Sequence, residues 1–594
     1  MLQLNPTINH HNLNFKKLSM QILQIKRNLF IITFLFSGFL FAQDRPLGGE
    51  TVIVVKPYTP SVNDAFKIKE TPAIGDSVML EKKPVQYSIF SVPVASTFTP
   101  AKGQATTVER AKPIKIFDNY VTLGFGTYST ALAEFYSNFE VNRSDNFGIF
   151  LTHNSSQGGI EDVQVDDKFY NTALNLNYNS RNRNSSWNTQ LGLEHQLINW
   201  YGIPRDLFQP ELTNINPSQN YYSAIIGGEF QLYDSFFERA SANYRYFGDA
   251  YNSTEHNFKT DALFEVNIAE ELITTTIEAD VVNGSFNRSF NVNQPANLDY
   301  TFINAGITPS LLILRDDLTV NLGASFIYSL NGENSKNSFY LYPKVTASYR
   351  LAGDYFIPYA GVEGSLKQNT YYNLAQDNPF VSPTLSIQPT DVPYDAYLGA
   401  RGKLTNSIAY NFRGSYISEF NKALFLKNPF NTTDDADYSY GNSFGVVYDD
   451  VTTLSFFAEV NVDVRRNFKL NMNAAYFSYS SEFQPEAWNL PDFKASILAD
   501  YQITDKWFAG ANVFFIGERK DLTSVRTGVS NFEQRAVTLD SFIDLNANLG
   551  YRFNNQLSVF AKGNNLLGDS YQRWADFPVQ GIQILAGATY KFDF

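Results

Sequence analysis

From about residue 117 onwards the chain repeats one unit, in which roughly ten residues alternate between apolar and polar side chains and a turn follows. In the stretch 543–553, Ile543 and Leu549 belong to the apolar set and Asn546 belongs to the polar set. Successive side chains of a β-strand face opposite sides of its sheet, so one set can face lipid while the other lines a polar lumen. A soluble sandwich alternates in the same way, but sustained repetition behind an export signal favours an all-β transmembrane barrel.

The connections between these units alternate in length. Every second connection is short and polar, as in Arg465-Arg466-Asn467, whereas the others are often long. The long connections cover residues 200–219, 368–393, 427–442 and 521–540. Short periplasmic turns and longer outer loops are typical of transmembrane barrels. The sequence therefore predicts an antiparallel barrel of about 22 strands over residues 117–594, and an even number returns the C-terminus to the periplasm.

The last unit places Ile584, Tyr590, Phe592 and Phe594 on one face and ends on a carboxy-terminal phenylalanine. Such an ending resembles the recognition signal of the barrel-assembly machinery, which we expect as a partner during biogenesis.

The N-terminal region reads as an export signal. Lys26 and Arg27 precede an apolar run over 29–41, and Ala42 precedes the expected cleavage at Gln43. The run of about 13 residues is too short for a spanning helix, which needs roughly 20. We therefore expect a signal peptide at residues 20–42 and interpret residues 1–19 as a mis-called upstream extension. The alternative is a long n-region of the signal.

Composition excludes several classes of function. The chain contains no cysteine, which excludes thiolate metal sites, cysteine nucleophiles, disulfide scaffolds and a lipoprotein anchor. The net charge of −13 argues against nucleic acid as a partner. An acidic surface can instead contact lipopolysaccharide through bridging divalent cations. No motif predicts a cofactor.

One short region resembles a known family. It comprises the run Lys562-Gly563-Asn564-Asn565-Leu566-Leu567-Gly568-Asp569, then Tyr571, then Phe577-Pro578. These residues resemble the closing hairpin of the TonB-dependent receptor family, although Leu567 replaces the usual phenylalanine and 579–581 replace the customary Pro-Gly-Arg. The resemblance implies an outer-membrane receptor that binds a bulky solute and imports it.

The same family implies a plug domain inside the barrel, and the sequence departs from this pattern. Residues 43–116 offer only about 75 residues, contain eight prolines and lack a glycine-rich arginine motif. Such a stretch is more typical of an extended, irregular periplasmic arm than of a folded plug. We therefore expect a barrel without a plug, or a lumen blocked by this segment, by inward loops or by a partner.

Within the arm, one segment resembles the TonB box, which adds a strand to the periplasmic energy-coupling protein. It consists of Glu50, Thr51, Val52, Ile53, Val54 and Val55. An extended β-branched peptide offers unpaired backbone groups to a sheet edge, so we predict partner binding here. The alternative is an ordinary strand in the mouth of the lumen.

Candidate catalytic and metal-binding residues are few. The histidines that follow the export signal, His153, His195 and His256, lie in three different predicted hairpins, and His195 is the best catalytic candidate. A girdle or loop histidine is the alternative. The acidic runs 434–437 and 161–167 could ligate Ca²⁺, but their spacing is not that of a Ca²⁺ loop, which favours solvated outer loops. We predict no catalytic residue, no metal site and no enzyme.

Aromatic residues form two predicted groups. Trp200 and Tyr201 at an outer strand end, and Trp507 at an inner one, are typical of interfacial girdles. The second group lies in loops away from strand ends and comprises Tyr371, Tyr372, Trp488 and Trp574. These loop aromatics suit either a stacking platform for sugars or peptides or contact with lipopolysaccharide.

Two functions follow from these patterns, and the sequence leaves both open. The first is a receptor-like barrel of the outer membrane that imports a bulky solute and is energised through its N-terminal arm. The second is a barrel without a plug that serves as a structural subunit of a larger outer-membrane complex, docked through the same arm. An open porin-like channel is a third, minor possibility.

Overall fold

The computed structural model describes residues 115–594 apart from 208–214, 269–270, 291–296, 432–435 and 529–530. The expected signal peptide, the segment Glu50–Val55 and nearly all of the expected arm lie outside the described residues. Among the residues that the structure describes, no helix is long and apolar enough to cross a membrane.

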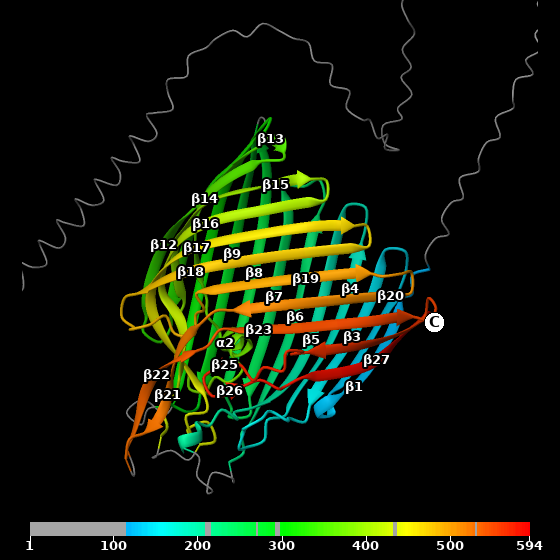
Figure 1. Cartoon of the computed structure of the whole chain (residues 1–594). Coiled ribbons are helices and arrows are strands. Elements are labelled where there is room, and N and C mark those ends of the chain that lie inside the picture. Colours follow the sequence, from blue (N-terminus) through cyan, green and yellow to red (C-terminus); the bar gives the residue numbers. More distant parts are fainter. Residues whose placement is uncertain (1–114, 208–214, 269–270, 291–296, 432–435, 529–530) are drawn as a thin grey trace, which may run out of the picture. The chain divides into compact units, whose positions relative to one another are not determined.

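The described chain forms one closed antiparallel β-barrel with 22 strands in its wall (Figure 1). The wall strands are β1 (Asn119–Gly126), β2 (Ala131–Glu140), β3 (Asp145–Ser156), β4 (Phe169–Arg181), β5 (Ser185–Asn199), β6 (Ser218–Leu232), β7 (Phe237–Asp249), β8 (Thr254–Ile268), β9 (Glu271–Phe286), β10 (Leu298–Arg315), β11 (Leu318–Asn331), β12 (Lys336–Tyr349), β14 (Ile357–Lys367), β15 (Thr390–Thr405), β16 (Ile408–Lys427), β17 (Phe444–Arg465), β18 (Phe468–Ser481), β19 (Phe493–Gln502), β20 (Trp507–Ile516), β23 (Phe542–Arg552), β24 (Leu557–Asn564) and β27 (Gln583–Phe592). The wall closes where β1 pairs with β27, from Asn119 opposite Phe592 to Gly126 opposite Leu585. The predicted strand number and closure through the last strand are confirmed.

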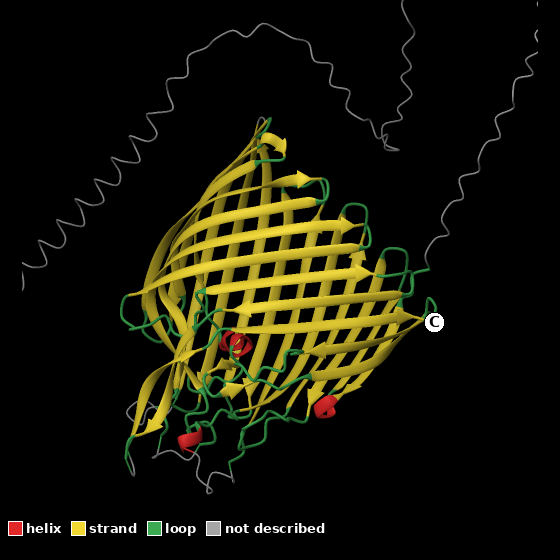
Figure 2. Cartoon of the chain, viewed as in Figure 1, coloured by secondary structure: helices red, strands yellow, loops and turns green. Residues whose placement is uncertain are grey.

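The remaining elements belong to connections. They are the 3-10 helices η2 (Thr127–Ser129) and η3 (Arg205–Leu207), the helix α2 (Tyr371–Asp377), and the short strands β13 (Leu351–Asp354), β21 (Arg519–Arg526), β22 (Phe532–Leu539), β25 (Gln572–Trp574) and β26 (Phe577–Pro578). Strands dominate, and α2 lies within the barrel rather than on its outside (Figure 2).

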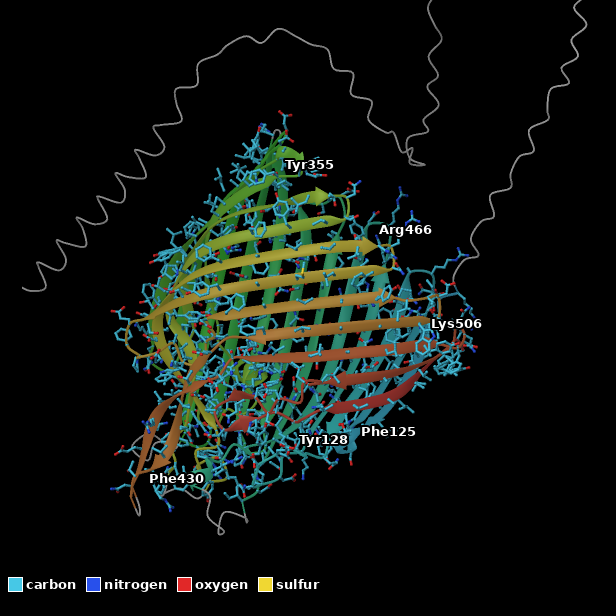
Figure 3. All side chains as sticks on the ribbon, in the orientation of Figure 1. Phe125, Tyr128, Tyr355, Phe430, Arg466 and Lys506 are labelled. Atoms are coloured by element: carbon cyan, nitrogen blue, oxygen red, sulfur yellow. The ribbon has the colours of Figure 1, made fainter. Side chains whose placement is uncertain are left out.

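The two ends of the barrel differ in their connections, as predicted. One end, called the turn end, carries short turns such as 316–317 and 466–467. The other, called the loop end, carries the long connections, including 200–217, 368–389, 428–443 and 565–582. Tyr355, Arg466 and Lys506 mark the turn end in Figure 3, and Tyr128 and Phe430 mark the loop end. In transmembrane barrels the short turns face the periplasm.

The alternation of side chains also follows the prediction. Ile543 and Leu549 of β23 are exposed on the outer face of the wall. Asn546 faces inward, where its side-chain amide donates to Asp544 and its oxygen accepts from the backbone N–H of Asn565. Ion pairs such as Lys259–Asp280 also join inward-facing residues of neighbouring strands. The wall therefore has one apolar and one polar face.

The wall is not equally tall all the way round. β16 and β17 contain 20 and 22 residues, whereas β1 and β24, on either side of β27, contain 8 each. The short strands surround the closing seam, and the tall strands lie elsewhere in the wall (Figure 1).

Candidate functional site

The long connections fold over the loop end and pack on one another inside its mouth. We call the resulting hydrophobic cluster the mouth core. It consists of Ile198, Trp200, Tyr221, Phe247, Val282, Phe286, Tyr300, Phe302, Tyr371, Leu374, Ala375, Val381, Leu385, Ile387, Ala436, Tyr438, Phe444, Trp574 and Phe577. Wall strands and loops contribute to it together, so the lumen is narrowed by the barrel's own loops. Of the alternatives that the sequence leaves open for the lumen, inward loops are the one that the described residues display.

The connection 368–389 enters furthest into the mouth and carries helix α2. Thr370 caps this helix, because its side-chain oxygen accepts a hydrogen bond from the backbone N–H of Asn373 at 3.1 Å. Tyr371 is fully buried, and its hydroxyl donates to the carboxylate of Asp249 at 2.8 Å. Burial raises the pKa of Tyr371 well above its usual value, so the hydroxyl stays protonated and remains a donor.

A buried carboxylate on the wall holds this connection in place. Glu255 of β8 accepts hydrogen bonds from the backbone N–H groups of Tyr371 and Tyr372 and from the hydroxyl of Tyr300, the last at 2.8 Å. Arg245 lies 3.8 Å from the same carboxylate and stacks over the ring of Tyr372 at 4.0 Å. A charge can be buried only when it is paired and hydrogen-bonded, and Glu255 meets both conditions through the loop that it anchors.

A second buried charge joins several loops. Lys427, the last residue of β16, is fully buried and pairs with Asp576. Its ammonium group also donates to the backbone carbonyls of Ala575, at 3.0 Å, and Gly202, at 3.2 Å. Thr523 of β21 donates to Asp576 at 2.7 Å. These contacts tie 200–217, 565–582 and the β21–β22 hairpin to the wall.

Near Lys427 lies a buried acid of the same hairpin. Asp521 is fully buried and accepts from the backbone N–H groups of Leu522 and Ala575. Burial raises the pKa of Asp521 to about 6, because removal from water disfavours the charged form more than these donors and Lys427 favour it.

The three histidines are not brought together. His195 donates to or accepts from the side chain of Asn220 at 2.9 Å and stacks on Tyr222. It shares the outward row of β5 with Leu191 and Leu193, which is the girdle alternative of the sequence interpretation rather than a catalytic arrangement.

The other two histidines occupy separate strands, where His153 contacts Thr172 and His256 contacts Tyr244. Among the described residues no group of three histidine or acidic side chains is placed to hold a metal ion.

The acidic loop residues are engaged individually. Asp167 accepts from the backbone N–H of Ile160, and Asp162 pairs with Arg205. Asp437 accepts from the backbone of Asn216. These contacts hold loops together, whereas Asp434 and Asp435 lie outside the described residues.

Two predictions about aromatic residues are wrong. Trp200, expected in an outer girdle, is fully buried in the mouth core, where it packs on Tyr438. Tyr371, Trp488 and Trp574 were expected to contact solutes or lipopolysaccharide, but all three are buried. The reason is common to all of them, since the loops fold inward and use their aromatic side chains as a core.

Trp507 follows the girdle prediction, because it is exposed on the outer wall at the turn end beside Tyr551. Sequence reasoning missed Glu255 and Lys427 as anchors. A charged residue close to the predicted outer end of a strand, facing aromatic-rich loops, is the signal that could have revealed them.

No protein-family model and no curated protein matches the sequence. Solved structures do match the fold, at low sequence identity. The ferripyoverdine receptor FpvA of Pseudomonas aeruginosa, bound to a heterologous pyoverdine, is 11% identical over 81% of this chain and 72% of its own, with a TM-score of 0.60.

Two further receptors match equally well. The siderophore receptor PirA of Acinetobacter baumannii is 12% identical over 81% of both chains, with a TM-score of 0.59. The ferric-catecholate import receptor Fiu of Escherichia coli is 10% identical over 81% of this chain and 83% of its own, with a TM-score of 0.58. These neighbours are transport receptors rather than enzymes. The barrel therefore has the 22-strand fold of TonB-dependent outer-membrane receptors, as the closing hairpin around residues 562–578 led us to expect.

Proposed function

We propose that this protein is a receptor-like barrel of the outer membrane that binds a bulky solute at its loop end and imports it. The observation that carries this proposal is the mouth core, because it presents a structured surface at the loop end. A mouth filled by packed loops argues against an open porin-like channel. The shared fold with receptors whose titles name siderophores and pyoverdines supports the same function.

Import against a gradient requires a source of energy, and the N-terminal arm is our candidate for the connection. In this proposal residues 20–42 direct export, and Glu50–Val55 add a strand to the periplasmic energy-coupling protein. Lipopolysaccharide around the wall and the barrel-assembly machinery are further proposed partners.

A second function is favoured by the way the loops are anchored. Glu255 and Lys427 are buried charges that hold the mouth closed through hydrogen bonds. A rigid, self-closed barrel suits a structural subunit of a larger outer-membrane complex, which has no need to open. In this alternative the arm docks a subunit instead of the coupling protein.

A proline substitution in the arm tests both functions. A panel of nutrients first identifies a condition in which cells lacking the protein grow poorly. Ile53→Pro removes a backbone donor, so it should abolish the rescue of growth and uptake while surface binding of the solute persists. Ile53→Val is the matched control, because it keeps the donor and the β-branched side chain.

The outcome separates the two functions. Loss of the cell's energy-coupling protein should reproduce the effect of Ile53→Pro if the barrel is an energised receptor. If the barrel is a structural subunit, Ile53→Pro should release a co-purifying protein, and loss of the coupling protein should have no such effect. If Ile53→Pro and deletion of residues 50–55 both leave growth, uptake and co-purifying proteins unchanged, the arm has no docking role.

A further inference from the structure

The wall parts between β12 and β14 on the side of the loop end. These strands pair over only five positions, from Ser348 opposite Tyr359 to Lys344 opposite Glu363. Both strands continue towards the loop end, β12 to Lys336 and β14 to Lys367. β12 stays paired with β11 over this whole length, so its other edge, 336–343, faces no strand of the described wall.

The sequence explains why the pairing stops there. The next residue of β12 beyond the last pair is Pro343, which has no N–H to donate and is typical of strand edges. A bulge follows Glu363 in β14. Beyond it the chain turns into the lumen, where Gln368 accepts a hydrogen bond from Asn304 of β10 at 2.9 Å. β14 therefore leaves the wall to lead into the inward connection 368–389.

The outer face beside the parting is unusually accessible. Phe339 and Leu341 of β12 are 68% and 61% exposed, whereas their partners on β11, Tyr328 and Phe326, are 46% and 36% exposed. All four lie in the outward apolar row of the wall. The parting thus opens at the depth of the membrane's outer leaflet, and its rim is apolar.

Behind the parting lies a polar cavity of about 330 Å³. Ser338 and Tyr340 of β12 line one side, and the segment 385–389 lines the other. Ser386 and Gln388 of that segment are exposed. The hydroxyl of Tyr342 donates to Asp391 at 2.8 Å, just beyond the unpaired stretch. Unpaired backbone at membrane depth is tolerated where it lines a wet cavity, which this arrangement provides.

We propose that the parting is a lateral binding site for a glycolipid-like amphiphile of the outer leaflet. Its acyl chain lies along Phe339 and Leu341, and its hydroxyl-rich head occupies the cavity. The lining chemistry favours a sugar over a phosphate, because Asp299 and Glu333 outnumber Lys336. Hydroxyl groups can donate to carboxylates and accept from ammonium and amide groups, all of which line the cavity. This site is separate from the import that we propose at the mouth.

A fluorescent probe can test access from the membrane. The chain has no cysteine, so Ser338→Cys provides a unique attachment point in the cavity. Thr346→Cys is the matched control, because it lies on the same inward face of β12 where the strand is paired with β14. Both full-length variants are labelled with bimane in bilayers that contain lipids with nitroxide-labelled chains.

Quenching at position 338 should exceed quenching at position 346 several-fold. Ser386→Trp should reduce it to the control level by filling the cavity, because the side chain of Ser386 is exposed there. Equal, weak quenching at both positions would show a cavity that holds water only and would overturn the proposal.

A pair of detergents then tests the head group. Octyl glucoside and the octyl ether of tetraethylene glycol share a chain and differ in the head. The bimane signal at position 338 should respond to the glucoside at an about tenfold lower concentration, which corresponds to roughly 1.4 kcal/mol. Equal response to both would overturn recognition of the sugar, and no response to either would overturn the site itself.

Discussion

The two ends of this barrel use the same strands for different purposes. At the turn end the connections are short, and Tyr355, Arg466 and Lys506 are exposed. At the loop end the connections are long and turn inward, and Trp200 and Tyr371 are fully buried. One end finishes the wall with local turns, whereas the other builds a second core on top of it.

The two ends also differ in the sequence distance of their contacts. Turns at the turn end depend on residues close in the chain, such as Asp234 and Asp316, whose positive φ angles suit aspartate. At the loop end Tyr221 donates to the carbonyl of Pro379, 158 residues away. The turn end should therefore tolerate single substitutions, whereas the loop end should lose several loops when one anchor is removed.

The largest effect should come from the closing strand, which both ends require. Tyr590 and Phe592 lie on the outward face of β27, and an aspartate on the lipid face costs about 2–4 kcal/mol at the membrane midplane and less towards the interfaces. The double substitution to aspartate should prevent assembly, measured as loss of the heat-modifiable barrel from outer membranes. Lys591→Gln, on the inward face, should assemble normally. Normal barrel levels in the double variant would show that the wall does not close through β27.

Removal of the anchor of α2 should have the next largest effect. Glu255→Leu leaves Arg245 buried without its partner and frees the N–H groups of Tyr371 and Tyr372, which should cost about 3–5 kcal/mol. Hydrogen exchange should accelerate across 370–378, and conductance in planar bilayers should rise. Glu255→Gln keeps an acceptor and should have a weaker effect. Unchanged protection in Glu255→Leu would remove this carboxylate from the account of the closed mouth.

Lys427→Met should loosen the mouth less, because Asp576 is partly exposed and keeps the hydroxyl of Thr523 as a donor. We expect a local loss of about 2–3 kcal/mol. Proteolysis of intact cells should then cut within 565–582 more readily. Lys506→Met removes an exposed lysine at the turn end and should change nothing. Equal sensitivity of the two variants would contradict the difference between the two ends.

The smallest effect should be a pH dependence of the β21–β22 hairpin. Folding raises the pKa of Asp521 from about 4 to about 6, so its contribution to stability is greatest below pH 4 and declines as the pH rises through 6. The hairpin should lose about 1 kcal/mol between pH 5 and pH 7, seen as faster hydrogen exchange after correction for the intrinsic rate. Asp521→Asn should remove this dependence. A steeper loss at low pH would reverse the assigned direction.

The sequence predicted the wall well because its signals are local. Alternation within about ten residues fixes which face of a strand meets lipid, so β5 begins at Ser185 beside the expected Trp187. The same reasoning failed for Trp200 and Tyr371, because alternation says nothing about where a long loop goes. Their burial depends on Tyr438 and Asp249, which are remote in the chain. The parting beside Pro343 was missed for a similar reason, since it depends on the inward turn of β14.

The unequal height of the wall has a consequence for the surrounding membrane. A strand of 8 residues, such as β1, extends over about 26 Å, and a tilt near 45° leaves roughly 19 Å along the membrane normal. The hydrocarbon core is about 30 Å thick. Lipids beside the closing seam must therefore shorten and splay, while those beside β16 and β17 need not. The protein thus carries a fixed thin spot in the bilayer along one flank, and neighbours with short hydrophobic walls will be drawn to that flank.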